Sequence, residues 1–502
     1  MSTPPPAPPS DDVPIGTLKH KAFGSAIWTF VRLGTDQAFN FVLFAILARL
    51  LGPTAFGVFA LAYLYAEVGK IITTAGLMDA LIREPKITDR IRDSVFWANI
   101  GFATILALAG LVLADPIARL LEVPAVAPLI KVLGFMLPIS AAGASHMSLR
   151  LREFGHKTVA LRSIVSGIVG GGAALVAAYL GWGVWAFVVQ RFVFEVVGTI
   201  LAWRAYPWIP GRQFSAHQLK ALFAFSSNML ITQLLFMLLI RVQDVIVGKL
   251  IGSAAVGIYR TAWKMTEVIA QGTIQPFSTV ALPTLSRLQN DPAGFDVAYR
   301  RLISTAAIFS LPALTGFGLV AGDAIVLLFG PQWTASVDVA RVISCMALPF
   351  TIGFFTSPAL AALGRSATIS KLALVQVVLT VSLSLLAAPY GLVAVAGAYV
   401  VRAYVTTPLQ MYALQRVQGV SMLKTFKSIA APFFASLVMG AAVLIMQLIL
   451  RDRINSPLLS LAVMVGVAAL VYALALLGFG GAQMRGQIGQ IKGFLRRRPA
   501  TT

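Results

Sequence analysis

The chain has 502 residues, of which 58% are hydrophobic and only 12% are charged. A soluble protein carries about 45–50% apolar and about 25% charged residues, so this composition excludes a water-soluble globular fold and predicts a polytopic membrane protein. The 40 Lys and Arg residues exceed the 19 Asp and Glu residues. Because these cations lie mostly in short gaps between apolar runs, they indicate membrane topology and argue against nucleic-acid binding. The single cysteine, Cys345, excludes an intrachain disulfide, and the four histidines have no metal-binding spacing.

Residues 1–18 begin with a Pro-rich, acidic stretch, which predicts a disordered cytoplasmic tail. Apolar stretches follow one another from there toward the C-terminus, and a helix needs about 20 residues to cross the hydrocarbon. Fourteen membrane-spanning helices are predicted, over residues 22–50, 54–80, 94–115, 125–149, 159–180, 183–205, 218–250, 254–285, 300–321, 337–363, 367–388, 391–415, 427–449 and 457–479. The connections between them are too short to hold a soluble catalytic domain.

The connections alternate between many and few basic residues. If the N-terminus is cytoplasmic, most Lys and Arg residues of the connections lie on the cytoplasmic side. The opposite side then carries only Arg49, Arg119, Lys249, Arg451 and Arg453. Because cytoplasmic connections are enriched in Lys and Arg, we predict that both termini are cytoplasmic.

The chain also repeats itself at an offset of 200 residues. The segment LLGPTAFGVF at 50–59 aligns with LIGSAAVGIY at 250–259, and Glu67 then aligns with Glu267. Chance similarity between apolar helices is the alternative, but the matching glycines, acids and loop positions favour duplication. Six spans per copy imply two parallel lobes, as in many transporters. The predicted parts are a disordered tail (1–18), an N-lobe with helices 1–6 (19–210), a C-lobe with helices 7–12 (211–418), helices 13–14 (419–482) and a basic cytoplasmic tail (483–502).

Charged residues inside the predicted spans are candidate functional residues, because a charge near the bilayer centre costs about 2.5–3.5 kcal/mol. The candidate substrate-binding cations are Arg32, Arg191, Arg241, Arg260, Lys264 and Arg402. The candidate residues for charge tuning or ion coupling are Asp36, Glu67, Lys70, Glu195, Asp244 and Glu267.

Two interpretations fit these charges, most of which are three or four residues from an opposite charge on the same helix face. In one, they pair within each helix and only lower the cost of burial. In the other, they line a polar cavity between the two halves, which their concentration in spans 1, 2, 7 and 8 favours. Arg402 has no acid at such a spacing, so it needs a partner from another helix or from a ligand. The excess of cations suits an anionic ligand, because a guanidinium group can donate two hydrogen bonds to phosphate oxygens.

The sequence has no Ser/His/Asp constellation, no Walker loop and no metal-binding spacing, which argues against an enzyme. We expect no cofactor. Transport would be driven by a gradient of H⁺ or Na⁺, by the membrane potential, or by consumption of the product on the far side.

Several stretches resemble a known family. They are ILARLLGPTAFGVFALA (46–62), IRVQDVIVGKLIGSAAVGIYRTAWKM (240–265), ALPTLSRLQND (281–291) and LLFGPQW (327–333). Together they resemble the Wzx-type polysaccharide flippases, and among these the branch named for colanic acid export. That family belongs to the multidrug/oligosaccharidyl-lipid/polysaccharide (MOP) superfamily. The resemblance covers about residues 15–485, and Ala55 departs from it, because relatives often carry an acid there.

The resemblance implies an all-α polytopic fold in which two six-helix lobes form a V around a central cavity, with two further C-terminal helices. It implies a lipid-linked oligosaccharide flippase of the bacterial inner (cytoplasmic) membrane. Such a protein moves undecaprenyl-pyrophosphate-linked repeat units to the periplasmic leaflet by alternating access, for exopolysaccharide, capsule or O-antigen synthesis. The cations would hold the pyrophosphate or acidic sugars, and the acids would tune them or carry coupling ions. Expected partners are the lipid-linked oligosaccharide, the bilayer, and the polymerase and chain-length regulator of the same pathway. Polar side chains available for sugar hydroxyls are Gln37, Asn40, Asn228, Gln233, Gln243 and Tyr259.

Three alternatives remain open: a cation-coupled multidrug exporter of the same superfamily, a lipid II flippase, and a membrane polysaccharide polymerase or ligase. A drug exporter would tend to show an unpaired membrane acid facing its cationic substrate, whereas the excess inside these spans is basic.

Overall fold

The computed structural model describes residues 15–74, 77–83, 87–450 and 456–479, which are helical apart from short turns. The two predicted tails lie largely outside these residues. Contacts divide the chain into two units. Unit 1 comprises residues up to 44, 62–116 and 127–233, and unit 2 comprises 45–61, 117–126 and 234 onward. The predicted lobe boundaries stay a prediction.

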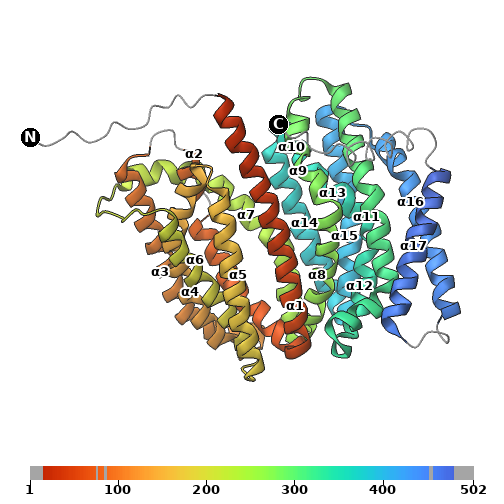
Figure 1. Cartoon of the computed structure of the whole chain (residues 1–502), viewed down its shortest axis with the longest axis horizontal. Coiled ribbons are helices and arrows are strands. Elements are labelled where there is room, and N and C mark those ends of the chain that lie inside the picture. The colour runs from red at the N-terminus through yellow and green to blue at the C-terminus, as the bar shows by residue number, and fades with distance from the viewer. Residues whose placement is uncertain (1–14, 75–76, 84–86, 451–455, 480–502) are drawn as a thin grey trace, which may run out of the picture. The chain divides into compact units, whose positions relative to one another are not determined.

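Unit 1 is built from the two outer parts of α1 and from the helices that follow (Figure 1). Their bounds are α1 Ile15–Thr74, α2 Leu77–Arg83, α3 Asp89–Leu121, α4 Val126–Arg152, α5 His156–Tyr179, α6 Trp185–Ala205 and, in its first half, α7 Ala216–Leu250. Close packing of α5 on α6 depends on Gly170, since a Cβ there would lie 2.8 Å from the backbone oxygen of Gln190. Small residues let membrane helices approach in this way.

Unit 2 continues from the second half of α7 through a bundle of long helices (Figure 1). Their bounds are α8 Ser253–Thr273, α9 Gln275–Thr279, α10 Ala281–Ser286, α11 Pro292–Phe329, η1 Pro331–Trp333, α12 Ala335–Ser344, α13 Ala347–Ala362, α14 Ser366–Ala387, η2 Ala388–Tyr390, α15 Leu392–Gln418, α16 Met422–Leu450 and α17 Pro457–Phe479. An apolar core of unit 2 contains residues of α11 and α13, including Phe295, Tyr299 and Phe355.

The predicted all-α polytopic fold is confirmed. Ten helices among the described residues are long and apolar enough to cross a membrane, and the bent pair α12 and α13 makes an eleventh candidate span. Most of the fourteen predicted spans coincide with one helix, but 54–80 extends from α1 into α2, 254–285 covers α8, α9 and α10, and 337–363 covers the bent pair α12 and α13. Helix α1 contains the first predicted span and most of the second, and it breaks between them at Gly52, whose φ of 69° and ψ of 171° are not helical. Helix α8 is not among these candidate spans, because it carries the charged residues Arg260, Lys264 and Glu267.

Candidate functional site

The charged centre of unit 2 lies where α7 meets α8. Asp244 of α7 is buried, and its Oδ2 atom lies 3.0 Å from Nη1 of Arg260 on α8. The same oxygen lies 3.8 Å from Nη1 of Arg241, one turn earlier on α7. The pair predicted from the spacing of Arg241 and Asp244 is therefore present, and a second arginine from the next helix joins it. One carboxylate thus serves two guanidinium groups, which leaves this cluster with a net positive charge.

A second cation, Lys264, follows Arg260 on the same face of α8. Lys264 lies one turn on, and its Nζ atom is 3.4 Å from Glu267, as the spacing predicts. Glu267 also accepts a hydrogen bond of 3.1 Å from Gln271. Residues three and four apart share a helix face, so the half-buried Trp263 lies on this face too. Its ring packs edge-on against Tyr399 of α15, with 5.0 Å between the ring centres.

Arg402 of α15 is buried, and its partners come from the protein. Its Nη1 donates a 2.8 Å hydrogen bond to Oε1 of Gln376 on α14. Its guanidinium carbon lies 4.0 Å from the ring centre of Tyr399, one turn earlier, in a cation–π contact. Within the described part of the chain its Nε is buried without a hydrogen-bond partner. An amide and an aromatic ring hold this guanidinium in place, and no acid of the described segments forms an ion pair with it.

Two polar residues expected to be available for sugar hydroxyls bond each other instead. The hydroxyl of Tyr259 donates to Oε1 of Gln243, and both side chains are buried. The amide of Gln243 then donates 2.9 Å to Ser384 and 3.4 Å to the backbone oxygen of Val395. Because a buried polar group without a partner is costly, this chain of bonds ties α7 and α8 to α14 and α15. Its role in the structure is to fix those helices around the cations.

In unit 1 the predicted charges pair between helices. Lys70 of α1 forms an ion pair with Glu195 of α6, whose side chain is buried. Arg191, one turn before Glu195, places its guanidinium carbon 4.8 Å from the ring centre of Tyr63. Spacing alone had suggested that Lys70 would pair with Glu67 and Arg191 with Glu195. Packing of α1 against α6 brings Lys70 and Glu195 together instead.

A cavity of about 260 Å³, lined by both polar and apolar side chains, lies in unit 1 next to Asp36. Ser163 of α5 donates a 2.9 Å hydrogen bond to the carboxylate of Asp36. Asn40 and Arg191 also line the cavity, so the structure brings a predicted substrate-binding cation and a predicted coupling acid to one place. The side chain of Arg32, which the spacing pairs with Asp36, lies outside the described residues.

Comparisons with known proteins agree with this fold. Residues 46–338, more than half of the chain, match the family described as "Polysaccharide biosynthesis protein". The chain belongs to this family. The resemblance predicted from the sequence is thereby confirmed, together with the prediction of a membrane transport protein.

The chain is similar to named relatives over most of its length. It is 25% identical to the succinoglycan biosynthesis transport protein ExoT of Rhizobium meliloti, over 90% of this chain and 91% of that protein. It is 24% identical to the teichuronic acid biosynthesis protein TuaB of Bacillus subtilis, over 91% and 95%. It is 21% identical to the lipopolysaccharide biosynthesis protein WzxC of Escherichia coli, over 67% and 69%.

Solved structures share the fold. The lipid II flippase MurJ in an inward closed conformation matches with a TM-score of 0.71 at 14% identity, over 93% of this chain and all of that one. A multidrug resistance MATE family transporter of the MOP superfamily, in an inward-facing conformation, matches with a TM-score of 0.57 at 16% identity, over 78% and 99%. The chain therefore shares the fold of these two proteins.

Proposed function

We propose that this chain is a flippase that moves a polyprenyl-pyrophosphate-linked oligosaccharide from the cytoplasmic to the periplasmic leaflet of the bacterial inner membrane. The observation that carries the proposal is the excess of cations in the charged centre of unit 2. Arg241, Arg260, Lys264 and Arg402 outnumber the acids beside them, Asp244 and Glu267. Membership of a polysaccharide biosynthesis family and the relatives named for transport support the same substrate class.

A pyrophosphate group fits this centre for electrostatic reasons. Arg402 is held by Gln376 and Tyr399 and forms no ion pair with an acid in the described part of the chain, so it is already oriented to receive an anion. Arg260 and Arg241 share Asp244, and an incoming phosphate would compete with that carboxylate for them. Hydrogen bonds between guanidinium and phosphate are charge-assisted and specific in geometry. The lipid tail would stay in the bilayer while the headgroup crosses by alternating access.

The same competition between the phosphate and Asp244 would couple transport to an ion. When the substrate draws Arg260 and Arg241 away, Asp244 is left buried, where an unpaired negative charge is costly. Uptake of a proton or a sodium ion would remove that cost. Asp36 in the cavity of unit 1 is a second candidate for this role. In a pathway, the product would pass to a polymerase and its chain-length regulator on the periplasmic side.

The test removes two cations of the charged centre in a strain that depends on the protein. Arg260→Gln combined with Lys264→Gln should trap completed repeat units on the cytoplasmic side, although the variant reaches the membrane. Mass spectrometry of polyprenyl-linked sugars, with the leaflet probed by an impermeant sugar-modifying enzyme, measures this. The matched control, Arg416→Gln with Lys424→Gln, removes the same charge from exposed positions on α15 and α16 and should export normally.

Two outcomes would contradict the proposal. Normal export by the Arg260→Gln/Lys264→Gln protein would show that these cations do not hold the headgroup. Repeat units that reach the periplasm and stay unpolymerised in a deletion strain would favour a polymerase.

A further inference from the structure

A break in α1 leaves a backbone carbonyl without its helical partner. Pro53 has no N–H group, so the carbonyl four residues earlier, on Arg49, loses its hydrogen bond. Side chains of η1, the short helix that follows α11, replace it. The amide of Gln332 donates 2.7 Å to the carbonyl of Ala48 and 3.0 Å to that of Arg49. The indole of Trp333 donates 2.9 Å to the carbonyl of Ala48. The broken end of α1 is therefore capped by residues nearly 300 positions away in the chain.

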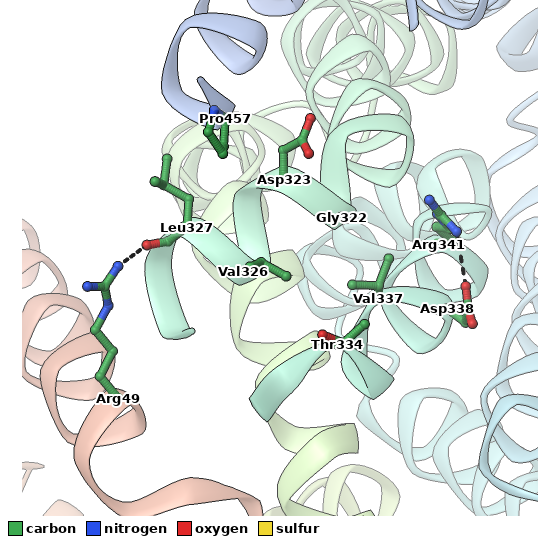
Figure 2. Close-up of a pocket in the computed structure, with 10 residues that line it drawn as sticks. All are labelled: Arg49, Gly322, Asp323, Val326, Leu327, Thr334, Val337, Asp338, Arg341 and Pro457. Carbon is green, nitrogen blue, oxygen red and sulfur yellow. Dashed lines mark hydrogen bonds and ion pairs between the residues drawn. The ribbon is translucent and has the colours of Figure 1, made fainter. Parts of the chain in front are cut away.

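Arg49 of α1 in turn caps the C-terminal end of α11. The last carbonyls of a helix lack partners within it, and here two of them, on Leu327 and Leu328, accept from the guanidinium of Arg49. The Nε of Arg49 lies 2.9 Å from the oxygen of Leu328. Figure 2 shows Arg49 reaching from α1 to the carbonyl of Leu327 at the edge of a pocket. The broken end of α1 and the segment formed by the end of α11 and η1 thus cap each other.

Two glycines bring the same segment of α1 against α8. A Cβ on Gly57 would lie 1.6 Å from the backbone oxygen of Ser253, and a Cβ on Gly257 would lie 2.0 Å from that of Pro53. Real Cβ atoms do not approach so closely, so both positions require glycine. The 200-residue repeat makes these two contacts equivalent to each other, because 53 corresponds to 253 and 57 to 257. The two copies of the repeat therefore meet here in a reciprocal contact.

The chain leaves unit 1 to make this contact and then returns to unit 1. Residues 45–61 pack in unit 2, although the residues on both sides of them, up to 44 and from 62, belong to unit 1. Leu47 and Ala48 are buried, whereas Arg49 and Gln332, which supply most of the capping hydrogen bonds, are exposed. Because water replaces exposed hydrogen bonds when they break, each of them contributes only about 0.5–1.5 kcal/mol net. A docking surface with a buried centre and water-exchangeable caps is suited to repeated release.

We propose that residues 45–61 form a latch, which docks on α8 and α11 in the closed state and leaves unit 2 during the transport cycle. The reciprocal caps set how often it opens. On the predicted topology, the latch lies on the periplasmic side, so its release opens that side. The link to transport rests on the proposed function, whereas docking and release do not.

The test measures release directly by the reactivity of a buried cysteine. The reporter is Leu47→Cys in a Cys345→Ser background, in nanodiscs that expose both sides to a maleimide. The labelling rate follows the population of the open form when closing is fast. Loss of one or two capping hydrogen bonds in Gln332→Ala or Arg49→Gln should raise the rate about tenfold, which corresponds to about 1.4 kcal/mol. Val58→Cys, also buried within the segment, serves as a second reporter if the first variant does not fold.

The matched control is Thr334→Ala. The hydroxyl of Thr334 donates 2.6 Å to the carbonyl of Pro331, within its own turn beside Gln332, so its loss should leave the labelling rate unchanged. Equal rates in Gln332→Ala, Arg49→Gln and the control, with both reporters, would overturn the latch.

A second arm connects release to transport. A bulky maleimide on Leu47→Cys prevents the segment from docking again, so labelling in cells should stop export, while the unlabelled variant exports. Continued export after complete labelling would refute a role of the latch in the cycle. If the caps control labelling but the cells accumulate no lipid-linked oligosaccharide when export is blocked, the latch stands and the proposed substrate is wrong.

Discussion

Removal of the Asp244 carboxylate should destabilise the protein more than removal of either arginine beside it. At an effective dielectric constant of about 20, charges 3.0 and 3.8 Å apart attract by about 5.5 and about 4.4 kcal/mol. Most of this attraction is offset by the cost of taking the charges out of water, and breaking a buried pair costs about 3–5 kcal/mol net. We expect Asp244→Asn to lower the free energy of unfolding by about 3 kcal/mol, because two guanidinium groups then lose their shared acid.

Each single arginine variant should lower the free energy of unfolding by less than Asp244→Asn does, and Arg260→Gln should lower it more than Arg241→Gln. In Arg260→Gln the carboxylate keeps Arg241, and the loss should be about 2 kcal/mol. In Arg241→Gln it keeps the nearer Arg260, and the loss should be about 1 kcal/mol. The double variant Asp244→Asn/Arg260→Gln should cost less than the sum of its parts, with a coupling energy of about 1–2 kcal/mol.

Thermal and denaturant unfolding of the purified protein in one detergent gives these values. The control cycle uses Asp115 and Lys131, an exposed pair of unit 1 at 2.9 Å whose side chains are 54% and 39% exposed. Exposed pairs are worth about 0–1 kcal/mol. A coupling energy for Asp244 and Arg260 no larger than in this control would refute the shared-acid arrangement. The double variant should recover part of its stability but none of its export, which separates the structural role of the pair from substrate binding.

Three further predictions follow from other contacts. Gln376→Leu should lower export several-fold with little loss of protein, because Arg402 loses the acceptor that orients it; export assays and thermal unfolding check this. Gly57→Val should lower the unfolding temperature by several degrees, since its Cβ would lie 1.6 Å from the backbone oxygen of the first residue of α8. The hydrogen bond from Lys249 and its charge lower the pKa of Glu122, which follows the end of α3. The stability from this ion pair should therefore be complete above about pH 4.3, the unfolded pKa, and disappear as the pH falls through the lower folded pKa. A Lys249→Gln variant should lack that part of the pH dependence in thermal unfolding.

The sequence predicted those features of the fold that depend on local chemistry. Mean hydropathy and charge depend on composition, and apolar runs are local, so the polytopic all-α fold and the position of most helices could be predicted, although 254–285 is three helices and not one span. The division of α1 between 50 and 54 was also predictable, because Gly52 and Pro53 interrupt helical hydrogen bonding wherever they stand. The ion pair of Lys264 with Glu267 lies within one turn, and spacing located it.

Partners on different helices could not be predicted in this way. Spacing shows which residues share a helix face, but it does not show which other helix packs against that face. Thus spacing places Lys70 beside Glu67 on its own helix, whereas packing pairs Lys70 with Glu195 of α6. Gln376, which orients Arg402, carried one available signal, a large polar side chain in the middle of an apolar span. A search for such residues would have found it.

The balance of charge within each unit argues for where the substrate binds. In unit 1, Glu195 neutralises Lys70, and Arg191 shares a cavity with Asp36. In unit 2, Arg402 is held by an amide and an aromatic ring, neither of which carries a compensating charge. A membrane protein bears the cost of an uncompensated buried cation only where something else recovers it, and an anionic ligand would do so. We therefore propose that the headgroup binds among α7, α8 and α15 of unit 2, and that the paired charges of unit 1 serve structure and ion coupling.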